Sequence, residues 1–209
     1  MTEIITRILL LLLAYLLGSI PFGLVLTRLF STVDLRSQGS GNIGATNVAR
    51  VAGPWLGIAT LTADLLKGLL PVLLVLTVRR GADPSGDLLL AGVALAAATG
   101  HMFPVYSRFK GGGKGVATTA GAYLGISALA ILLSLVVFGL VAGLTRRVSA
   151  GSLCSAVTLP PALWLMTGST IYMLSGIVAA ALIIIRHREN IGRLMAGTEP
   201  EFKTKGDKP

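Results

Sequence analysis

Small polar residues and one arginine crowd a segment near the N-terminus, residues 37–50. Its glycines let backbone amides approach a ligand closely, and successive amides can form a concave anion site. Neutral hydrogen-bond donors and a guanidinium suited to phosphate come from Ser40, Asn42, Thr46, Asn47 and Arg50. We therefore predict that these five residues bind phosphate. The alternative is a flexible polar loop without a ligand.

A second segment places three glycines between two lysines, Lys110 and Lys114, and leads directly into an apolar run. Glycine amides, ammonium groups and the partial positive charge of a helix N-terminus all favour an anion. We predict phosphate contacts from Gly112, from Gly113 and from one of the two lysines. The choice between the lysines stays open, and the alternative is that both only anchor a membrane helix.

Two further segments are basic. Ser149 and Ser152 follow a pair of arginines, a pattern that is weak by itself. Near the C-terminus, His187 and Asn190 lie three residues apart among arginines, so a helix that continued through them would put both on one face. His187 titrates near neutral pH in its unperturbed state. It is therefore the candidate for either a catalytic base or an anchor for substrate.

The residue types in these segments exclude several chemistries. They contain almost no carboxylates and no cluster of His, Cys and Asp with metal-ligand spacing. No Gly-x-Ser-x-Gly motif occurs, and neither histidine has an aspartate four or five residues later. We expect no metal ion and no cofactor. A site of this kind suits activated, phosphate-bearing substrates, because positioning and charge stabilisation can carry most of the catalysis.

The elements that position these segments are membrane helices. The sequence is 53% hydrophobic and only 13% charged, with a mean hydropathy of +0.79, whereas a soluble domain of this size usually has about 25% charged residues. A helix needs about 20 mainly apolar residues to cross the bilayer. The predicted spans are Ile4–Leu26, Trp55–Val78, Leu88–Tyr106, Leu153–Thr167 and Ile171–Ile185, together with a short and a long helix that divide Val116–Leu144 near Gly125-Ile126-Ser127.

The positive charges predict the orientation of these seven helices. With the N-terminus outside and the C-terminus cytoplasmic, 14 of the 18 lysines and arginines fall inside, as the positive-inside rule requires. Arg79 and Arg80 do not fit this arrangement. The net charge of +9 is thus explained by the membrane, and we expect no nucleic-acid partner. The predicted fold is one all-α integral membrane domain, residues 1–197, followed by a polar cytoplasmic tail, residues 198–209.

Two charged residues lie inside a predicted span, Asp64 and Lys67. Intramembrane charges are costly and mark either function or pairing. Because the two residues are three positions apart, we expect a mutual buried pair rather than a contact with substrate. We expect His101, at the end of the next span, to be a structural hydrogen-bonding residue.

Three long motifs, in order, resemble those of the bacterial PlsY-type acyl-phosphate:glycerol-3-phosphate acyltransferases. They are Gly39-Ser-Gly-Asn-Ile-Gly-Ala-Thr-Asn47, Gly100-His-Met-Phe-Pro-Val-Tyr106 with Phe109-Lys-Gly-Gly-Gly-Lys-Gly-Val-Ala-Thr118, and His187-Arg-Glu-Asn190 with Gly197-Thr-Glu199. The resemblance covers nearly the whole sequence. The sequence departs from the family pattern by one extra glycine between the lysines, which leaves open which lysine takes the phosphate-binding role.

The resemblance implies a seven-helix fold in the bacterial cytoplasmic (inner) membrane, with the site on the cytoplasmic face. It implies transfer of a fatty acyl group from acyl phosphate to the 1-hydroxyl of glycerol 3-phosphate, which gives lysophosphatidic acid and phosphate in the first step of phospholipid synthesis. The implied partners are these two substrates, the lipid bilayer and, functionally, the enzyme that makes acyl phosphate.

Carried over by motif, the implied catalytic residues are His187, Asn190, Ser40 and Lys114 (or Lys110). Ser149 or Ser152 completes the phosphate site. His187 would orient glycerol 3-phosphate, while a phosphate group takes the proton of the hydroxyl. Two other classes compete with this interpretation. A transporter or channel for an anionic metabolite would place basic groups deep within the spans, and an adaptor that binds anionic lipid would not need loops rich in Ser, Asn and Thr.

Overall fold

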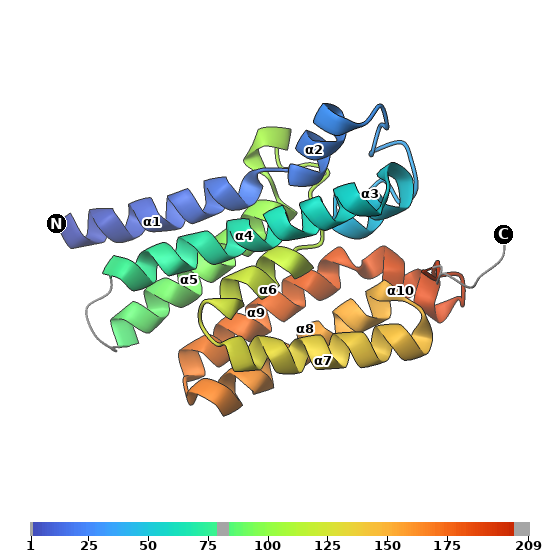
Figure 1. Ribbon diagram of the computed structural model, residues 1–209. Helices are drawn as coiled ribbons and strands as arrows, with labels where there is room; N and C mark the ends of the chain where they lie inside the picture. Colours follow the sequence, from blue (N-terminus) through green and yellow to red (C-terminus); the bar gives the residue numbers. More distant parts are fainter. Residues whose placement is uncertain (1, 79–83, 203–209) are drawn as a thin grey trace.

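The computed structural model describes residues 2–78 and 84–202, and these residues form a bundle of α-helices without a strand (Figure 1). Arg79, Arg80 and the lysines of the tail lie outside the described residues. The elements are α1 (Thr2–Ser19), α2 (Phe22–Phe30), α3 (Ala45–Ala52), α4 (Pro54–Val78), α5 (Pro84–Met102), η1 (Val105–Ser107), α6 (Val116–Leu124), α7 (Ala128–Thr145), α8 (Val148–Thr167), α9 (Thr170–Arg186) and α10 (Arg188–Met195).

The helices have the length and composition of membrane spans, which confirms the all-α membrane class. Within the described ranges, four helices could each cross a bilayer, or up to six spans exist if each bent pair is one span. The predicted division of Val116–Leu144 is confirmed, because α6 ends at Leu124 and Ser127 caps the start of α7. The nine residues of α6 rise only about 14 Å, less than half of the hydrocarbon thickness. Seven spans and the orientation of the termini therefore remain predictions.

Two bends between consecutive helices were not indicated by the hydropathy pattern. The span predicted over Ile4–Leu26 is broken at Ile20-Pro21, where α1 and α2 meet at 41°. Proline has no backbone N–H and interrupts the helical hydrogen bonds at this point. The last span does not continue straight either, because α9 and α10 meet at 63° on either side of His187.

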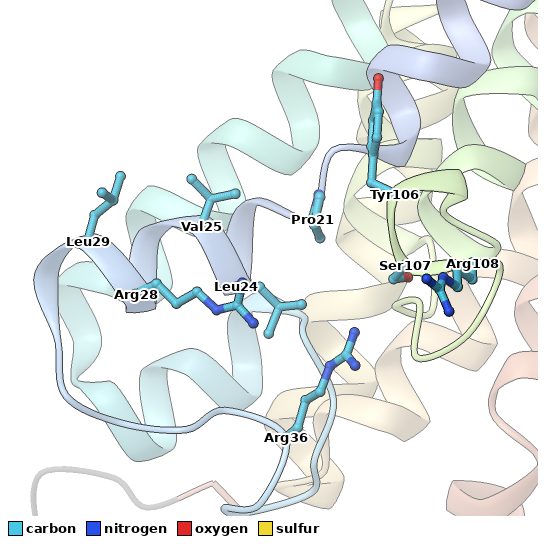
Figure 2. Close-up of a pocket in the computed structure, with 9 residues that line it drawn as sticks. All are labelled: Pro21, Leu24, Val25, Arg28, Leu29, Arg36, Tyr106, Ser107 and Arg108. Atoms are coloured by element: carbon cyan, nitrogen blue, oxygen red, sulfur yellow. The ribbon is translucent and has the colours of Figure 1, made fainter.

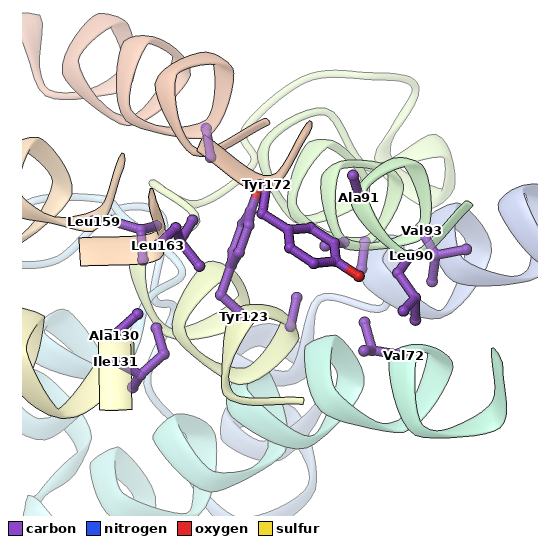
Figure 3. Close-up of a cluster of buried hydrophobic side chains, with 14 of the residues drawn as sticks. Val72, Leu90, Ala91, Val93, Tyr123, Ala130, Ile131, Leu159, Leu163 and Tyr172 are labelled. Atoms are coloured by element: carbon purple, nitrogen blue, oxygen red, sulfur yellow. The ribbon is translucent and has the colours of Figure 1, made fainter. Parts of the chain in front are cut away.

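The interior of the bundle is made of small residues and a few large ones. Tyr123, on α6, is fully buried in the main cluster, and Tyr172, on α9, lies beside it in Figure 3. Glycines allow close helix contacts, since a Cβ on Gly121 would collide with the backbone carbonyl of Leu65 on α4. Many leucines of α7 point outward instead, such as Leu140, which is 60% exposed. An outer surface of this kind is matched to lipid.

The polar segments gather at one end of the bundle. Figure 1 shows α3 and α10 at the end opposite the N-terminus. Ser149 and Ser152 belong there as well, although they lie on the first two turns of α8 and not in the loop that we predicted before Leu153. The bends at Ile20-Pro21 and His187 turn α2 and α10 away from the axes of their preceding helices and so build this polar end.

Candidate functional site

Asn47 organises the first glycine-rich loop. Its side-chain amide is buried and donates to the backbone carbonyls of Gln38 (3.2 Å) and Asn42 (3.0 Å). Its side-chain oxygen accepts a hydrogen bond from the backbone N–H of Ser40 at 2.9 Å. Both ends of the amide are thus engaged within the loop. Asn47, which we expected to contact phosphate, holds the loop in shape instead.

Two other residues of this loop face a pocket. Ser40 is exposed and lines the pocket together with Asn42. The Asn42 side-chain oxygen accepts from the backbone N–H of Gly44 at 2.8 Å, which fixes the turn and the direction of its amide. Thr46 and Arg50 lie exposed on α3 and are not among the lining residues, although the charge of Arg50 reaches Lys114.

The second glycine-rich loop is clamped by Arg186 at the end of α9. The guanidinium donates to the carbonyl of Gly112 at 2.6 Å and to that of Gly113 at 3.1 Å. It also lies 5.5 Å from the centre of the Phe103 ring, a cation–π contact. Gly113 packs so closely against His101 that a Cβ would lie 1.9 Å from Nε2 of the imidazole. Glycine at this position therefore allows the loop to lie directly on α5.

Of the two lysines that flank these glycines, only Lys114 lines the pocket. Burial lowers the pKa of Lys114 to about 8; the arginines Arg193 and Arg50 act in the same direction and Glu199 opposes them. Lys110 is exposed and lies outside the lining residues. The structure thus favours Lys114 where the sequence left both lysines open.

A buried polar network lies beneath this loop. Asp64 and Lys67 form the expected ion pair at 2.8 Å, with both side chains 3% exposed. His101 brings Nδ1 within 3.5 Å of the same carboxylate, as a structural residue would. Lys67 also donates to the carbonyl of Ile20 at 2.7 Å, one of the carbonyls at the break between α1 and α2. The network therefore joins the helix break to the second glycine-rich loop.

His187 lies at the junction of α9 and α10 with its side chain buried. Its Nδ1 is 2.8 Å from the carbonyl of Ile183. Because a carbonyl only accepts, Nδ1 carries the proton and Nε2 is left as an acceptor. Burial lowers the pKa of His187 to about 4, and the hydrogen bond to Ile183 offsets only part of this effect. The imidazole is therefore neutral at physiological pH.

Asn190 is held by a carboxylate that sequence reasoning did not select, Glu199. One carboxylate oxygen accepts from the Asn190 amide at 2.5 Å, and the other accepts from Nε of Arg193 at 2.7 Å. Burial by itself would raise the pKa of Glu199, but the nearby Ser149 hydroxyl, these two hydrogen bonds and the Arg193 charge bring it below the usual value. Glu199 belongs to the Gly197-Thr-Glu199 motif, so a signal was present, although we had assigned it to the polar tail.

Of the two candidate serines, Ser149 lies nearer this carboxylate. Its buried hydroxyl is near enough to lower the pKa of Glu199 as a hydrogen-bond donor does, although no hydrogen bond of good geometry forms between them. Ser152 is also buried, one turn further along α8. Neither serine is among the lining residues of the pocket.

The pocket itself has a volume of about 140 Å³ and lies where the two glycine-rich loops meet the end of α9 and α10. Its described lining residues are Ser40, Gly41, Asn42, Gly111, Gly112, Lys114, Arg186, Arg188, Glu189, Asn190 and Arg193. Four cations and one carboxylate are therefore present in this lining. In residues 2–78 and 84–202, no three His, Cys, Asp or Glu side chains gather closely enough to hold a metal ion.

Five of the predicted site residues thus meet in one pocket: Ser40, Asn42, Gly112, Lys114 and Asn190. His187 is not among the lining residues, although the charges of Lys114 and Glu199 influence its pKa. The structure adds three arginines to the lining that we had regarded only as flanking charges, Arg186, Arg188 and Arg193. Such a pocket can bind a phosphate group through charge-assisted hydrogen bonds.

Fold and pocket together define a helical integral membrane protein with a cationic, glycine-lined anion pocket at one end of the bundle. The sequence profile of a family described as glycerol-3-phosphate acyltransferase matches residues 8–197. The chain belongs to this family.

Relatives match over almost their full length. A glycerol-3-phosphate acyltransferase of Syntrophotalea carbinolica is 47% identical, over 92% of this chain and 96% of the relative. One from Geobacter sulfurreducens is 46% identical, over 91% and 94%. The crystal structure of the glycerol 3-phosphate form of PlsY (YgiH), an integral membrane glycerol 3-phosphate acyltransferase, has a TM-score of 0.88 and 40% identity, covering 95% of this chain and 96% of that one. Its lysophosphatidic acid form has a TM-score of 0.86 and 39% identity.

Proposed function

We propose that this protein transfers a fatty acyl group from acyl phosphate to the 1-hydroxyl of glycerol 3-phosphate. The products are lysophosphatidic acid and inorganic phosphate, and the reaction is the first step of phospholipid synthesis. The observation that carries the proposal is the pocket of about 140 Å³ in which Lys114 and three arginines meet the glycine-rich loops. A small phosphate ester fits both its size and its charge.

The lining of the pocket supports a role for each of these groups in holding a phosphate. Lys114 and Arg193 supply charge, and Arg188 supplies a planar guanidinium suited to two phosphate oxygens. Ser40 and Asn42 add neutral donors from the first loop. Arg186 has a different role, because it is engaged with two loop carbonyls and positions the glycine amides.

His187 is best suited to orient the hydroxyl of glycerol 3-phosphate. Its Nε2 is the free acceptor of the ring, so it can accept a hydrogen bond from the neighbouring 2-hydroxyl, which leaves the proton of the attacking 1-hydroxyl to the phosphate. With a pKa of about 4, the ring is a weak base: protonating it costs about 3 kcal/mol more than protonating an unperturbed imidazole. This energy favours an anchor over a general base, the alternative that the sequence left open.

The phosphate of the donor is then the acceptor of the proton. The hydroxyl oxygen forms the new ester bond at the acyl carbon, and the bond from that carbon to the phosphate oxygen breaks. The hydroxyl proton passes to the departing phosphate, so no protein base is consumed. The cations of the pocket stabilise the negative charge that develops on the leaving phosphate and on the acyl oxygen.

The location follows from the same proposal. We infer that the protein lies in the bacterial cytoplasmic membrane with seven helices, the N-terminus outside and the pocket on the cytoplasmic face. Water-soluble glycerol 3-phosphate reaches the pocket from the cytosol, and the acyl chain reaches it from the bilayer. Functional coupling to the enzyme that makes acyl phosphate would supply the donor.

The test uses the full-length protein purified in detergent, with palmitoyl phosphate and glycerol 3-phosphate, and follows phosphate release and lysophosphatidic acid. We expect turnover that requires both substrates. A folded protein that releases no phosphate above background would refute the function. His187→Gln separates the two roles of the histidine, because an amide oxygen can replace an acceptor but not a base. We expect His187→Gln to retain clearly more activity than His187→Ala; equal loss in both would argue for the base.

A further inference from the structure

A second and larger cavity lies next to the pocket described above. It is an open groove of about 510 Å³ between α2 and the turn around η1 (Figure 2). The bend at Ile20-Pro21 turns α2 away from the axis of α1 on this side. Residues 106–108 form one wall of the groove. The opposite wall is apolar and comes from α2 and the residue before it: Pro21, Leu24, Val25 and Leu29.

Three arginines from three different segments line the groove. Arg28 comes from the last turn of α2, Arg36 from the first loop and Arg108 from the turn after η1. In Figure 2 the Arg36 side chain reaches between Leu24 and the turn that carries Arg108. The described residues that line the groove include no carboxylate.

The charges of these arginines are not compensated by the protein. The ion pairs within residues 2–78 and 84–202 include none of the three. Asp34, the acidic residue nearest to Arg36 in the sequence, accepts a hydrogen bond from the backbone N–H of Arg36 at 3.1 Å and not from its guanidinium. The groove therefore has a positive potential that favours an anion.

The turn that carries Arg108 is fixed before any ligand binds. The backbone N–H of Arg108 donates to the carbonyl of Val105 at 3.0 Å, and that of Phe109 donates to the carbonyl of Pro104 at 2.9 Å. These bonds hold Arg108 and Phe109 in the left-handed region, with φ of 53° and 62°. A backbone that is already ordered lowers the entropic cost of binding.

The surface around the groove is apolar. On α2, Leu29 is 68% exposed and Phe30 is 71% exposed, and Tyr106 and Phe109 on the other side are 60% and 61% exposed. A short helix with exposed apolar residues beside arginines is suited to the interface between hydrocarbon and headgroups. A free phosphate ion would leave the apolar wall uncovered, whereas the chain of a lipid would cover it.

The ligand of the groove is separated from the reacting groups. The Arg36 guanidinium packs against Gly111, where a Cβ would lie 3.3 Å from one of its terminal nitrogens. Gly111 belongs to the loop that lines the smaller pocket, so this loop stands between the two cavities. Both phosphates of the proposed reaction belong in the smaller pocket, among its cations. The amphiphile that remains for the groove is a constituent of the bilayer itself.

We propose that the groove binds an anionic phospholipid of the bilayer, with its phosphodiester headgroup between Arg28, Arg36 and Arg108 and one chain along the apolar wall of α2. The inference goes beyond the proposed function, because this lipid is neither substrate nor product. Phosphatidylglycerol has the matching headgroup, since it carries a net negative charge. Phosphatidylcholine is less suited, because its quaternary ammonium would face the arginines.

The experiment measures lipid binding without turnover. Full-length protein in dodecyl maltoside is titrated with dioleoylphosphatidylglycerol or dioleoylphosphatidylcholine, and bound lipid is counted by native mass spectrometry. The variant Arg28→Gln/Arg108→Gln removes two cations from the groove. The control Lys110→Gln/Arg146→Gln removes the same charge from residues that line neither cavity.

We expect the wild type to bind phosphatidylglycerol about tenfold more tightly than phosphatidylcholine, because basic side chains at a membrane surface attract anionic headgroups. The groove variant should lose this preference and keep its affinity for phosphatidylcholine, which also shows that it is folded. The control should keep the preference. Arg28→Lys/Arg108→Lys should restore most of it, since the charge returns.

Three results would overturn the inference: no preference in the wild type, a preference that persists in the groove variant, or an equal loss in the control. The last result would mean that surface charge alone attracts the lipid. Palmitoyl phosphate provides a further test, because displacement of bound phosphatidylglycerol by an equimolar amount would assign the groove to the acyl donor instead. A protein that binds phosphatidylglycerol through the groove but releases no phosphate would refute only the proposed function.

Discussion

Glu199→Gln is the substitution that tests the site most directly, because Glu199 contacts two pocket residues without lining the pocket itself. The change keeps the shape of the side chain and an acceptor oxygen for Asn190. It removes the negative charge and turns the atom that faces Arg193 from an acceptor into a donor. Asn190 and Arg193 would then lose the support that fixes their direction.

The expected magnitude follows from these two contacts. A hydrogen bond to a charged group contributes about 1.5–3 kcal/mol, and an ion pair with a partly exposed partner contributes about 0.2–1 kcal/mol. Arg193 is 37% exposed in this pair, so the lower range applies to it. Because glutamine retains one acceptor, we expect a loss of about 1–2 kcal/mol. This corresponds to a fall in kcat/KM for glycerol 3-phosphate of about 5- to 30-fold.

The same substitution should also change how the activity depends on pH. The charge of Glu199 raises the pKa of Lys114, which burial brings down to about 8. Lys114 is charged below this value and loses its proton above it, so activity should fall as the pH rises through about 8 in the wild type. Without the Glu199 charge, the pKa of Lys114 falls further, and the decline of activity should begin at lower pH.

The assay measures phosphate release at varied glycerol 3-phosphate over a series of pH values. The matched control is Glu201→Gln, which removes a carboxylate two residues away that lies 3.8 Å from Arg146 and touches neither pocket residue. We expect the control to match the wild type. If Glu199→Gln kept the wild-type kcat/KM, and its activity declined at the same alkaline pH as that of the wild type, Glu199 would not position Asn190 and Arg193.

Three further substitutions test the two loops. Lys114→Gln should reduce kcat/KM by about a hundredfold. Lys110→Gln, which alters an exposed side chain outside the pocket, should reduce it by less than about threefold. Comparable losses of the two variants in steady-state assays would show that Lys114 is not the lysine that binds phosphate by itself. Gly113→Ala should lower the free energy of unfolding by about 1–3 kcal/mol, and with it the thermal midpoint, because the new Cβ meets His101. The control Gly192→Ala has open space around it and should not lower the thermal midpoint. Equal midpoints for the two variants would refute the close packing of Gly113 against His101. Asn47→Ala should raise KM for glycerol 3-phosphate about tenfold through loss of the Ser40 amide contact, and an unchanged KM would show that the loop keeps its shape without it.

Local sequence patterns were sufficient for the class of the protein and for most of the helices. The predicted Trp55–Val78 and Ile171–Ile185 spans differ from α4 and α9 by at most one residue at each end, because an apolar run bounded by polar residues is a local property. The division of Val116–Leu144 was visible in the glycine and serine that interrupt it. The bend at Ile20-Pro21 was missed because apolar residues continue on both sides of it, and the bend at His187 because it lies beyond the apolar run, among charged residues whose pattern does not fix the direction of a helix.

The sequence by itself determined that this is a membrane protein with glycine-rich, basic segments suited to phosphate, because composition, spacing and charge bias are readable along the chain. Only the tertiary structure decided which polar groups remain free for a ligand. Asn47 bonds to its own loop, Glu199 supports Asn190, and Arg186 clamps Gly112, a residue 74 positions away. Each buried donor or acceptor takes the nearest partner in space, and that partner depends on how the helices pack.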